Sequence, residues 1–390
     1  MVAQDETMSW KRLFQRSLAA APDRLHMAAH SHHLWPDASW LGHQAAWDDA
    51  ARLADRKWDR VMGEVWPAAQ AHVAAELSLP DPASIVFAGN THDFLIRLVA
   101  AVDKRPVRVL ASDGEFHSFR RQAARWVEQG AITLETLPVA PFESFTDRFV
   151  AAAEAGGHDL IMVSQVMFGS GAVFAGIEAL AALARPEGPW VLVDGYHGFM
   201  AVPTDLSAVA DRIFYVAGGY KYAMAGEGGA FMHAPPGFAL RPPLTGWYAA
   251  FDDLRLPPGA VGYAPDARRF MGATFDPSGL YRFVAVRDML AREGLDTATV
   301  AAHVAGLKAR LTARLGETPL GGATLLNPGG GHAARFLALR SPDAQRWQAA
   351  LLDDDVVTDV RGDVLRIGIG LYHDERDIDR FVAAAKALVL

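Results

Sequence analysis

Apolar and polar positions alternate in blocks along the chain, and the blocks predict a mixed α/β protein. Short, almost uninterrupted apolar runs that are rich in β-branched residues predict buried strands. They lie at residues 83–89, 106–112, 159–166, 189–197 and 212–219. Segments with apolar residues at helical spacing lie between or after them, at 90–102, 116–130 and 177–188. Strands that are apolar on both faces and alternate with helices indicate a mostly parallel sheet covered by helices on both sides.

The pattern changes from about residue 290 onward. A long amphipathic helix is predicted over 297–317, and shorter strand and helix patterns follow at 333–340, 356–370 and 377–390. A chain of 390 residues is long for a single core, so a large domain with a smaller one is expected. We therefore predict an N-terminal segment that contributes to the active site and the small domain, a large domain, and a small C-terminal α+β domain. Their predicted bounds are 1–45, 46–285 and 286–390.

Composition narrows the class of protein. With 51% hydrophobic and 21% charged residues the chain is typical of soluble globular proteins. A net charge of -8 without a Lys/Arg-rich run argues against a nucleic-acid partner. No uncharged apolar run reaches the ~18 residues of a membrane span, and the first residues carry no apolar signal-peptide core. We expect a cytoplasmic enzyme. The absence of cysteine excludes disulfides, thiolate metal sites and cysteine nucleophiles.

Polar, charged or aromatic side chains follow each predicted strand of the large domain. Ligands of such sheets bind at the carboxyl ends of the strands, so these side chains are candidates for a common site. In chain order they are Asn90, Thr91, Phe116, Ser164, Asp194, His197, Tyr220 and Lys221.

Lys221 stands in an unusual context, the stretch "GGYKYAMAGEGGAF" at 218–231. Most lysines lie on the surface, but here an apolar strand precedes the residue and small residues and glycines follow it. A lysine in an apolar pocket has a lowered pKa and can attack a carbonyl as a free amine, forming a Schiff base. Pyridoxal 5'-phosphate (PLP) is the carbonyl partner that suits this context.

The neighbouring strand ends supply what PLP requires. The pyridinium nitrogen needs a carboxylate, and Asp194 ends an apolar strand. The phosphate needs a helix N-terminus, which Asn90 and Thr91 begin, and the ring needs a flat cover such as Phe116 or His117. Alone, each has an ordinary structural explanation, as a cap, a turn or a core residue. Their combination along one sheet edge points to PLP.

Two segments, "DGYHGFMAVPTDL" (194–206) and "GGYKYAMAGEGGAFMH" (218–233), resemble the class V aminotransferase family of fold type I PLP-dependent enzymes, and within it most closely the kynureninases. The resemblance covers roughly residues 24–385. It implies a mostly parallel seven-stranded sheet sandwiched by helices, with a small C-terminal α+β domain. It also implies that Lys221 carries the cofactor, that Asp194 pairs with the pyridine nitrogen, and that His197 lies near the phenolic oxygen or orients Asp194. Tyr220 would bind the phosphate and take part in proton transfer.

Further roles follow from the same resemblance. The Thr91 hydroxyl and the Asn90 amide would bind the phosphate. "EFHSF" (115–119) is similar to the family's Phe-Pro-Ser stretch, with His117 in place of the proline, which makes Phe116 the stacking ring. "SQVMFGSG" (164–171) places Ser164 beside the cofactor.

Two further matches imply a partner subunit. "TGWYAAF" (245–251) and "FMGATFDPSG" (270–279) resemble segments whose Trp247 and Thr274 would reach the phosphate of a partner, so the resemblance implies a homodimer with shared sites. "VLRIGIGLYHDERDID" (364–379) resembles the segment that binds the substrate, which makes Arg366 the clamp for an α-carboxylate. A guanidinium suits that role, although a strand-surface ion pair would explain an arginine there equally simply.

The segment "HMAAHSHHLWPD" (26–37) departs from the kynureninase pattern. His30, His32 and His33 stand where a slim turn is usual. Their spacing lacks an acidic partner or an HExxH arrangement, so we predict no metal site. We expect these histidines to line the substrate entrance, with His30 and His32 in contact with the substrate.

Several functions remain open at this point. The first is hydrolytic C–C cleavage of a kynurenine-type amino acid, for which Trp35, Phe116, Trp247 and Tyr248 could surround an aryl group. Transamination needs only Lys221, Asp194 and Arg366 and is the main alternative, with another PLP β-lyase beside it. Cysteine desulfuration through a persulfide-forming cysteine is disfavoured because the chain has none, whereas a direct selenocysteine or sulfinate lyase is not. A non-catalytic binding protein of this fold would not need Lys221.

Overall fold

The computed structural model describes residues 9–251, 256–257, 259–327 and 334–388. Its centre is a seven-stranded sheet in the order β2-β8-β7-β6-β5-β3-β4. β8 is antiparallel to both neighbours, and the other strands run in one direction. In the order of the sheet the strands are Ile85–Ala88, Ala230–His233, Ile213–Gly218, Trp190–Asp194, Leu160–Ser164, Val107–Ser112 and Ile132–Leu137. The mostly parallel α/β fold predicted from the sequence is confirmed.

The five predicted strands of the large domain are all present, and two further strands were not predicted. β4 lies at the sheet edge and has a single buried position, Ile132, so it lacks a continuous apolar run. β8 has only four residues and follows a glycine-rich stretch. Both depend on pairing with neighbours, which a local hydrophobic pattern does not reveal.

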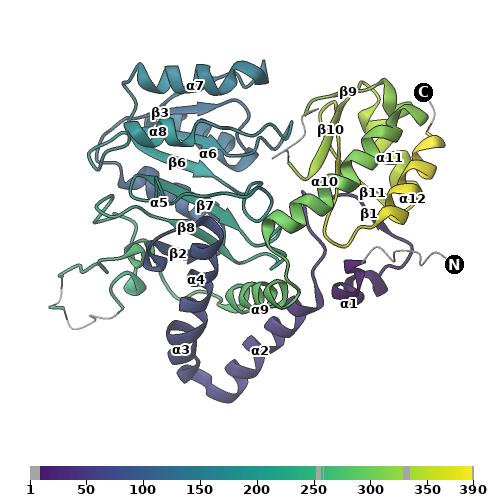
Figure 1. Cartoon of the computed structure of the whole chain (residues 1–390). Helices are drawn as coiled ribbons and strands as arrows, with labels where there is room; N and C mark the ends of the chain where they lie inside the picture. Colours follow the sequence, from purple (N-terminus) through teal and green to yellow (C-terminus); the bar gives the residue numbers. More distant parts are fainter. Residues whose placement is uncertain (1–8, 252–255, 258, 328–333, 389–390) are drawn as a thin grey trace.

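Helices follow the strands and cover the sheet (Figure 1). α5 packs against β2, β7 and β8, α6 against β4, and α8 against β6. The helices of this part are α3 (Lys57–Arg60), α4 (Trp66–Leu77), α5 (Thr91–Ala101), α6 (His117–Glu128), α7 (Phe145–Glu154) and α8 (Ile177–Leu183). The connection over 234–266 contains a short 3-10 helix, Trp247–Ala250, and its residues 252–255 and 258 lie outside the described part.

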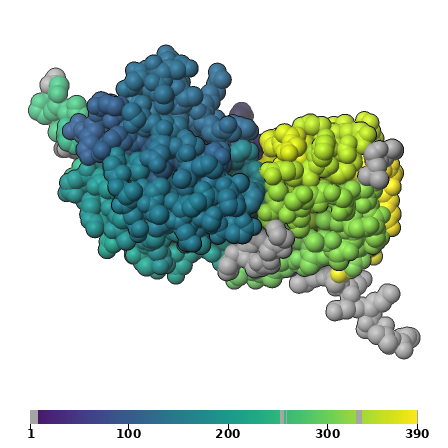
Figure 2. All heavy atoms as spheres, turned by 90° about the horizontal axis from the view of Figure 1, so that it is seen from above, coloured from purple at the N-terminus to yellow at the C-terminus, as the bar shows by residue number. Residues whose placement is uncertain are grey.

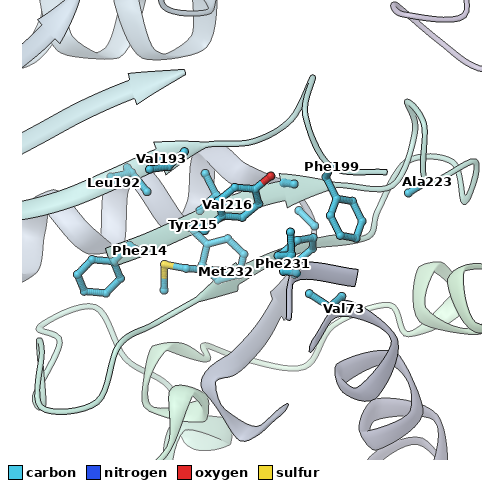
Figure 3. Packing of buried hydrophobic residues seen from close by; sticks show 14 of the residues in the cluster. Val73, Leu192, Val193, Phe199, Phe214, Tyr215, Val216, Ala223, Phe231 and Met232 are labelled. Carbon is cyan, nitrogen blue, oxygen red and sulfur yellow. The ribbon is translucent and has the colours of Figure 1, made fainter. Parts of the chain in front are cut away.

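The main core lies between the sheet and the helices that cover both of its faces. Figure 3 shows Phe199 beside Phe231 of β8, above the helix that carries Val73. Phe199 and Phe231 meet edge to face with ring centroids 4.7 Å apart. The burial of these strands on both faces explains their continuous apolar sequences.

Two long helices, α2 (Asp37–Leu53) and α9 (Ser278–Arg292), lie side by side beneath the sheet (Figure 1). Gly42 permits this approach, because a methyl group there would lie 2.5 Å from the carbonyl oxygen of Tyr281. The Tyr281 hydroxyl also donates to Asp49 Oδ2 at 2.9 Å. This hydrogen bond ties α2 to α9, a helix more than 200 residues later in the chain.

A second, smaller core lies beside the main one (Figures 1 and 2). It is built on a four-stranded antiparallel sheet in the order β12-β13-β10-β9, together with a parallel pair of β1 and β11. β1 belongs to the N-terminal segment, so both ends of the chain contribute to this part. Its strands are β1 (Leu25–His26), β9 (Thr324–Leu325), β10 (Phe336–Arg340), β11 (Val356–Val357), β12 (Asp359–Arg361) and β13 (Val364–Gly368). The flanking helices are α10 (Thr297–Arg314), α11 (Ala344–Asp353) and α12 (Glu375–Lys386), whereas α1 (Gln15–Ala19) packs against the main core through Leu18.

Candidate functional site

A cavity of about 1340 Å³ opens at the carboxyl ends of β3, β5, β6 and β7 and at the start of α5. It brings together eight of the residues that the sequence analysis singled out. These are Asn90, Thr91, Phe116, Ser164, Asp194, His197, Tyr220 and Lys221. The five other candidates, Arg366, His30, His32, Trp247 and Thr274, do not belong to the lining found among the described residues.

Lys221 follows β7 and is buried, with 5% of its surface exposed. Its Nζ lies 2.7 Å from His197 Nε2 and 4.8 Å from the centre of the Tyr196 ring. Burial lowers the pKa of Lys221 below its ordinary value, against the attraction of Asp194. Burial, together with the charge of Lys221, also lowers the pKa of His197. A neutral lysine amine is therefore favoured, as a nucleophile requires.

Close backbone packing explains the glycines around Lys221. A methyl group on Gly218 would overlap the Tyr196 hydroxyl, and one on Gly219 would lie 2.7 Å from the carbonyl oxygen of Gly226. Gly226 itself has φ of +73°, a conformation that favours glycine. Side chains at these three positions would disturb the close packing of the segment around Lys221.

Asp194 ends β6 beside Ser164 of β5. Its Oδ1 accepts a hydrogen bond from the Tyr196 amide at 2.9 Å. Burial raises the pKa of Asp194, and the Tyr196 amide and the charge of Lys221 oppose that rise. Within the described residues no lysine, arginine or histidine pairs with this carboxylate at ion-pair distance. A buried carboxylate without a protein counter-ion is costly, and a cationic ring nitrogen would compensate it.

The N-terminus of α5 faces the same cavity through Asn90, Thr91 and His92. The Asn90 side chain caps the helix by accepting from the Asp93 amide at 3.0 Å. The backbone N–H groups at the first helical positions have no intrahelical partner. Together with Thr91 and Tyr220 they can bind a phosphate, to which a helix N-terminus is electrostatically suited.

Two residues of the site were missed by the sequence analysis, and the first is Glu115. It is fully buried, accepts from the hydroxyls of Ser112 at 2.6 Å and Ser164 at 2.5 Å, and also from the Ser164 amide at 3.2 Å. Burial raises the pKa of Glu115 to about 7, although the two serine hydrogen bonds work against this. Its place just after a predicted strand was visible in the sequence, but its burial depends on Ser164 from another strand.

Tyr196 is the second missed residue. Its ring lies 4.8 Å from that of Tyr220, and both rings lie within 6 Å of Lys221 Nζ. Its position between Asp194 and His197 in the chain was the available signal. Phe116, the predicted stacking ring, has its centre 5.6 Å from Lys221 Nζ.

Arg366 lies on β13 and is 3% exposed. Its Nη1 donates to the carbonyl oxygen of Phe168 at 2.6 Å, and its Nη2 pairs with Asp359. Its guanidinium therefore already has an anionic partner within the chain.

The three histidines of the N-terminal segment occupy different environments. His32 is exposed, stacks on Tyr220 with ring centroids 4.9 Å apart, and its Nε2 lies 3.5 Å from Glu227. His30 is fully buried against Phe336, with centroids 4.7 Å apart. His33 is also buried, so neither His30 nor His33 has the surface position expected of a residue at the substrate entrance. The reason is that this segment packs against the β13 end, where Gly368 contacts His30. Within the described residues no cluster of potential ligands is arranged to hold a metal ion.

Trp247 and Thr274 lie on the surface, Trp247 with 45% of its area exposed. Their predicted role in a partner's site therefore stays a prediction. Among the described residues no helix is long and apolar enough to cross a membrane.

Comparisons with known proteins agree on the fold. No family model matches the chain. Isopenicillin N epimerase of Streptomyces clavuligerus is 29% identical, over 87% of this chain and 89% of that protein. A structure of the cystine C–S lyase C-DES with its product cysteine persulfide superposes with a TM-score of 0.80 at 17% identity, covering 95% of this chain and 99% of that one. The cysteine desulfurase CsdA from Escherichia coli superposes with a TM-score of 0.77 at 17% identity, covering 95% and 96%. The chain has the fold of the fold type I PLP-dependent enzymes.

Proposed function

We propose that the protein is a PLP-dependent enzyme that acts on an amino acid. The observation that carries the proposal is the meeting of three groups in one cavity. They are the buried amine of Lys221, the half-buried carboxylate of Asp194, which has no ion-pair partner among the described residues, and the N-terminus of α5. An amine, a carboxylate and an anion site match the aldehyde, the ring nitrogen and the phosphate of PLP.

The comparisons support the same cofactor. A second structure of C-DES, a variant with a TM-score of 0.79 to this chain, has glycine covalently linked to its PLP cofactor. In this chain Lys221 would hold PLP covalently and Asp194 would pair with its ring nitrogen. Asn90, Thr91 and Tyr220 would hold the phosphate, and Phe116 and His197 would enclose the ring. When bound, the cofactor supplies an electron sink for the substrate α-carbon.

Lys221 would accept the proton of the substrate α-carbon, and neighbouring residues would position its amine. Because burial favours the neutral amine of Lys221, this group can accept a proton from the α-carbon near neutral pH. His197 contacts the same nitrogen and would orient it. Tyr196 and Tyr220 lie against it and would exclude water from the amine.

For the reaction outcome we propose hydrolytic C–C cleavage of a kynurenine-type substrate, as the sequence resemblance implies. The aromatic rings of Phe116, Phe168 and Tyr196 in the cavity lining support an aryl substrate. Transamination and another β-lyase reaction are the alternatives. Because one relative is an epimerase, inversion at the α-carbon is a further alternative, and it too requires proton exchange at that carbon. Desulfuration through a persulfide-forming cysteine is excluded because the chain has no cysteine.

Two assays on the PLP-loaded protein separate these outcomes. Anthranilate fluorescence after addition of L-kynurenine or 3-hydroxykynurenine tests the hydrolysis, and the proposal expects its release. Proton NMR in D₂O tests exchange at the α-carbon of a panel of L-amino acids. Exchange without anthranilate release would contradict kynurenine hydrolysis and leave an epimerase, transaminase or lyase. Absence of both would contradict the proposed enzyme.

A further inference from the structure

Arg366, the arginine expected to bind a substrate carboxylate, is held by a carboxylate of its own chain. Asp359 is its direct partner in the β12–β13 pairing, opposite it in register. The Asp359 carboxylate accepts from Arg366 Nη2, while the Phe168 carbonyl accepts from Nη1. The rings of Phe168 and Phe336 each lie 5.8 Å from the guanidinium carbon. Among the described residues, Arg366 therefore has both polar partners and an aromatic enclosure without any substrate.

Asp359 is itself firmly held. Its side chain is 10% exposed, accepts from Arg361 Nη1 at 2.5 Å, and lies 3.5 Å from His30 Nε2. Burial alone would raise the pKa of Asp359, but the contact with His30 and the charges of Arg366 and Arg361 outweigh it and lower the pKa to about 2. The aspartate is therefore ionised at neutral pH. Burial lowers the pKa of His30 to about 3, so His30 is neutral and does not compensate a second anion.

A substrate carboxylate reaching Arg366 would meet this aspartate. Two carboxylates at one guanidinium repel each other, and the repulsion is stronger at a site with little water. The incoming group must either displace Asp359 or share Arg366 with it. In both cases the α-carboxylate contributes less to binding than it would at a free arginine.

We infer that Asp359 is a specificity-determining residue that competes with the substrate carboxylate for Arg366, so that amino acids bind through their side chains rather than through the α-carboxylate alone. This inference rests on the proposed function. It assigns the site to amino acids with large side chains that fill the cavity, and it predicts weak binding of small ones such as L-alanine.

The test is the variant Asp359→Asn, which removes the charge but retains an acceptor oxygen for Arg366. The matched control is Asp363→Asn, which removes the same charge at the β12–β13 turn, where the side chain is 61% exposed. The PLP-loaded proteins are titrated with L-alanine and with ethylamine, which carries no carboxylate, and the PLP absorbance is followed. For Asp359→Asn we expect the Kd of L-alanine to fall about tenfold, with that of ethylamine changing less than twofold. Asp363→Asn should match the wild type for both.

An unchanged or higher Kd for L-alanine in Asp359→Asn, with an unchanged circular dichroism spectrum, would overturn the inference. A higher value would show that Asp359 positions Arg366 for the substrate. Failure of the wild type to load PLP would contradict the proposed function instead. If the wild type does not load PLP, the competition is measured by calorimetric titration of the unloaded proteins with propionate. The inference expects propionate to bind more tightly to Asp359→Asn than to the wild type. Equal or weaker binding there would likewise overturn it.

Discussion

At the scale of single residues, Lys221 and Asp194 line the cavity, and Glu115 lies behind it, where it accepts a hydrogen bond from the lining residue Ser164. Burial lowers the pKa of the lysine and raises the pKa of both carboxyl groups, so each is shifted toward its neutral form. Such shifts cluster at functional sites because they match a group's protonation to a task. In this site the shifts favour a free amine at Lys221, and a cation bound at Asp194 would favour the ionised form of its carboxyl group.

Glu115 is expected to hold the strand ends beneath the site together. Glu115→Ala leaves the hydroxyls of Ser112 and Ser164 without their acceptor, and we expect it to lower the free energy of unfolding by about 3 kcal/mol. Glu115→Gln keeps one acceptor oxygen and should cost about 1 kcal/mol. Urea denaturation at pH 7 measures both. A Glu115→Ala protein as stable as the wild type would show that the network contributes nothing.

His33 should make stability depend on pH. Its Nδ1 lies 2.8 Å from the Leu34 carbonyl and its Nε2 accepts from the Leu371 amide at 3.3 Å, so the folded protein holds it neutral. Burial lowers its pKa to about 3, against about 6.5 in the unfolded chain. The contribution is complete above pH 6.5 and is lost as the pH falls toward 3.

Between pH 7.5 and 5.5 this one histidine should cost about 1.4 kcal/mol of stability. The measurement is the change in unfolding free energy between these two pH values, compared for wild type and His33→Gln. Other titrating groups cancel in that comparison. On going from pH 7.5 to pH 5.5, the unfolding free energy of the wild type should fall by about 1.4 kcal/mol more than that of His33→Gln. Equal losses in the two proteins would show that His33 is not held neutral.

The residues predicted from the sequence and those missed differ in a physical way. Lys221 and Asp194 were predicted because each lies next to its own apolar strand, so that local sequence signals burial. Glu115 stands in "SDGEFHSF", a polar stretch typical of an exposed turn. Its environment is made by Ser164, 49 residues later, and that contact leaves no local pattern.

At the scale of elements, the carboxyl ends of neighbouring strands form the site, so the registry of the sheet matters. Asp159, directly before β5, joins that strand to β3. It accepts from the backbone amide and Nε of Arg108, both at 3.0 Å, and from Lys104 Nζ at 3.0 Å. Hydrogen bonds from Arg108 lower the pKa of Asp159 well below its usual range despite burial.

Asp159→Asn should therefore reduce the unfolding free energy by about 2 kcal/mol at pH 7, because charged hydrogen bonds are replaced by weaker ones. The difference from wild type should shrink as the pH falls below about 4, where the unfolded aspartate takes up a proton. Asp147→Asn, at an exposed position of α7, serves as control and should be neutral. A loss that stays the same at pH 3 would assign the effect to packing instead of charge.

The elements predicted from the sequence are those with continuous apolar runs. β5, β6 and β7 were recognised because they are covered on both faces. β8 was not, since four residues after a glycine-rich loop carry little signal, and its antiparallel insertion between β2 and β7 is a long-range choice of pairing. The predicted residues nevertheless meet at one edge of the sheet, because β2 and β7 both run parallel to the remaining strands.

At the scale of the whole molecule, the predicted homodimer explains why Trp247 and Thr274 lie exposed and away from their own cavity. We expect a dimer by sedimentation at micromolar concentration. Trp247→Ala should keep the fold and weaken PLP retention about tenfold, measured by dialysis followed by absorbance. A monomeric wild type that retains PLP would contradict shared sites.

The central claim is that Lys221 binds PLP covalently, and the most direct test is the intact mass of the protein after incubation with PLP and reduction with borohydride. The account predicts that the wild type gains one reduced PLP group and that Lys221→Ala gains none. Lys308→Ala is the control, because Lys308 is another largely buried lysine, whose pKa burial lowers to about 8, and it should label like the wild type. A Lys221→Ala protein that still gains the full mass, or a wild type that gains none, would contradict the account.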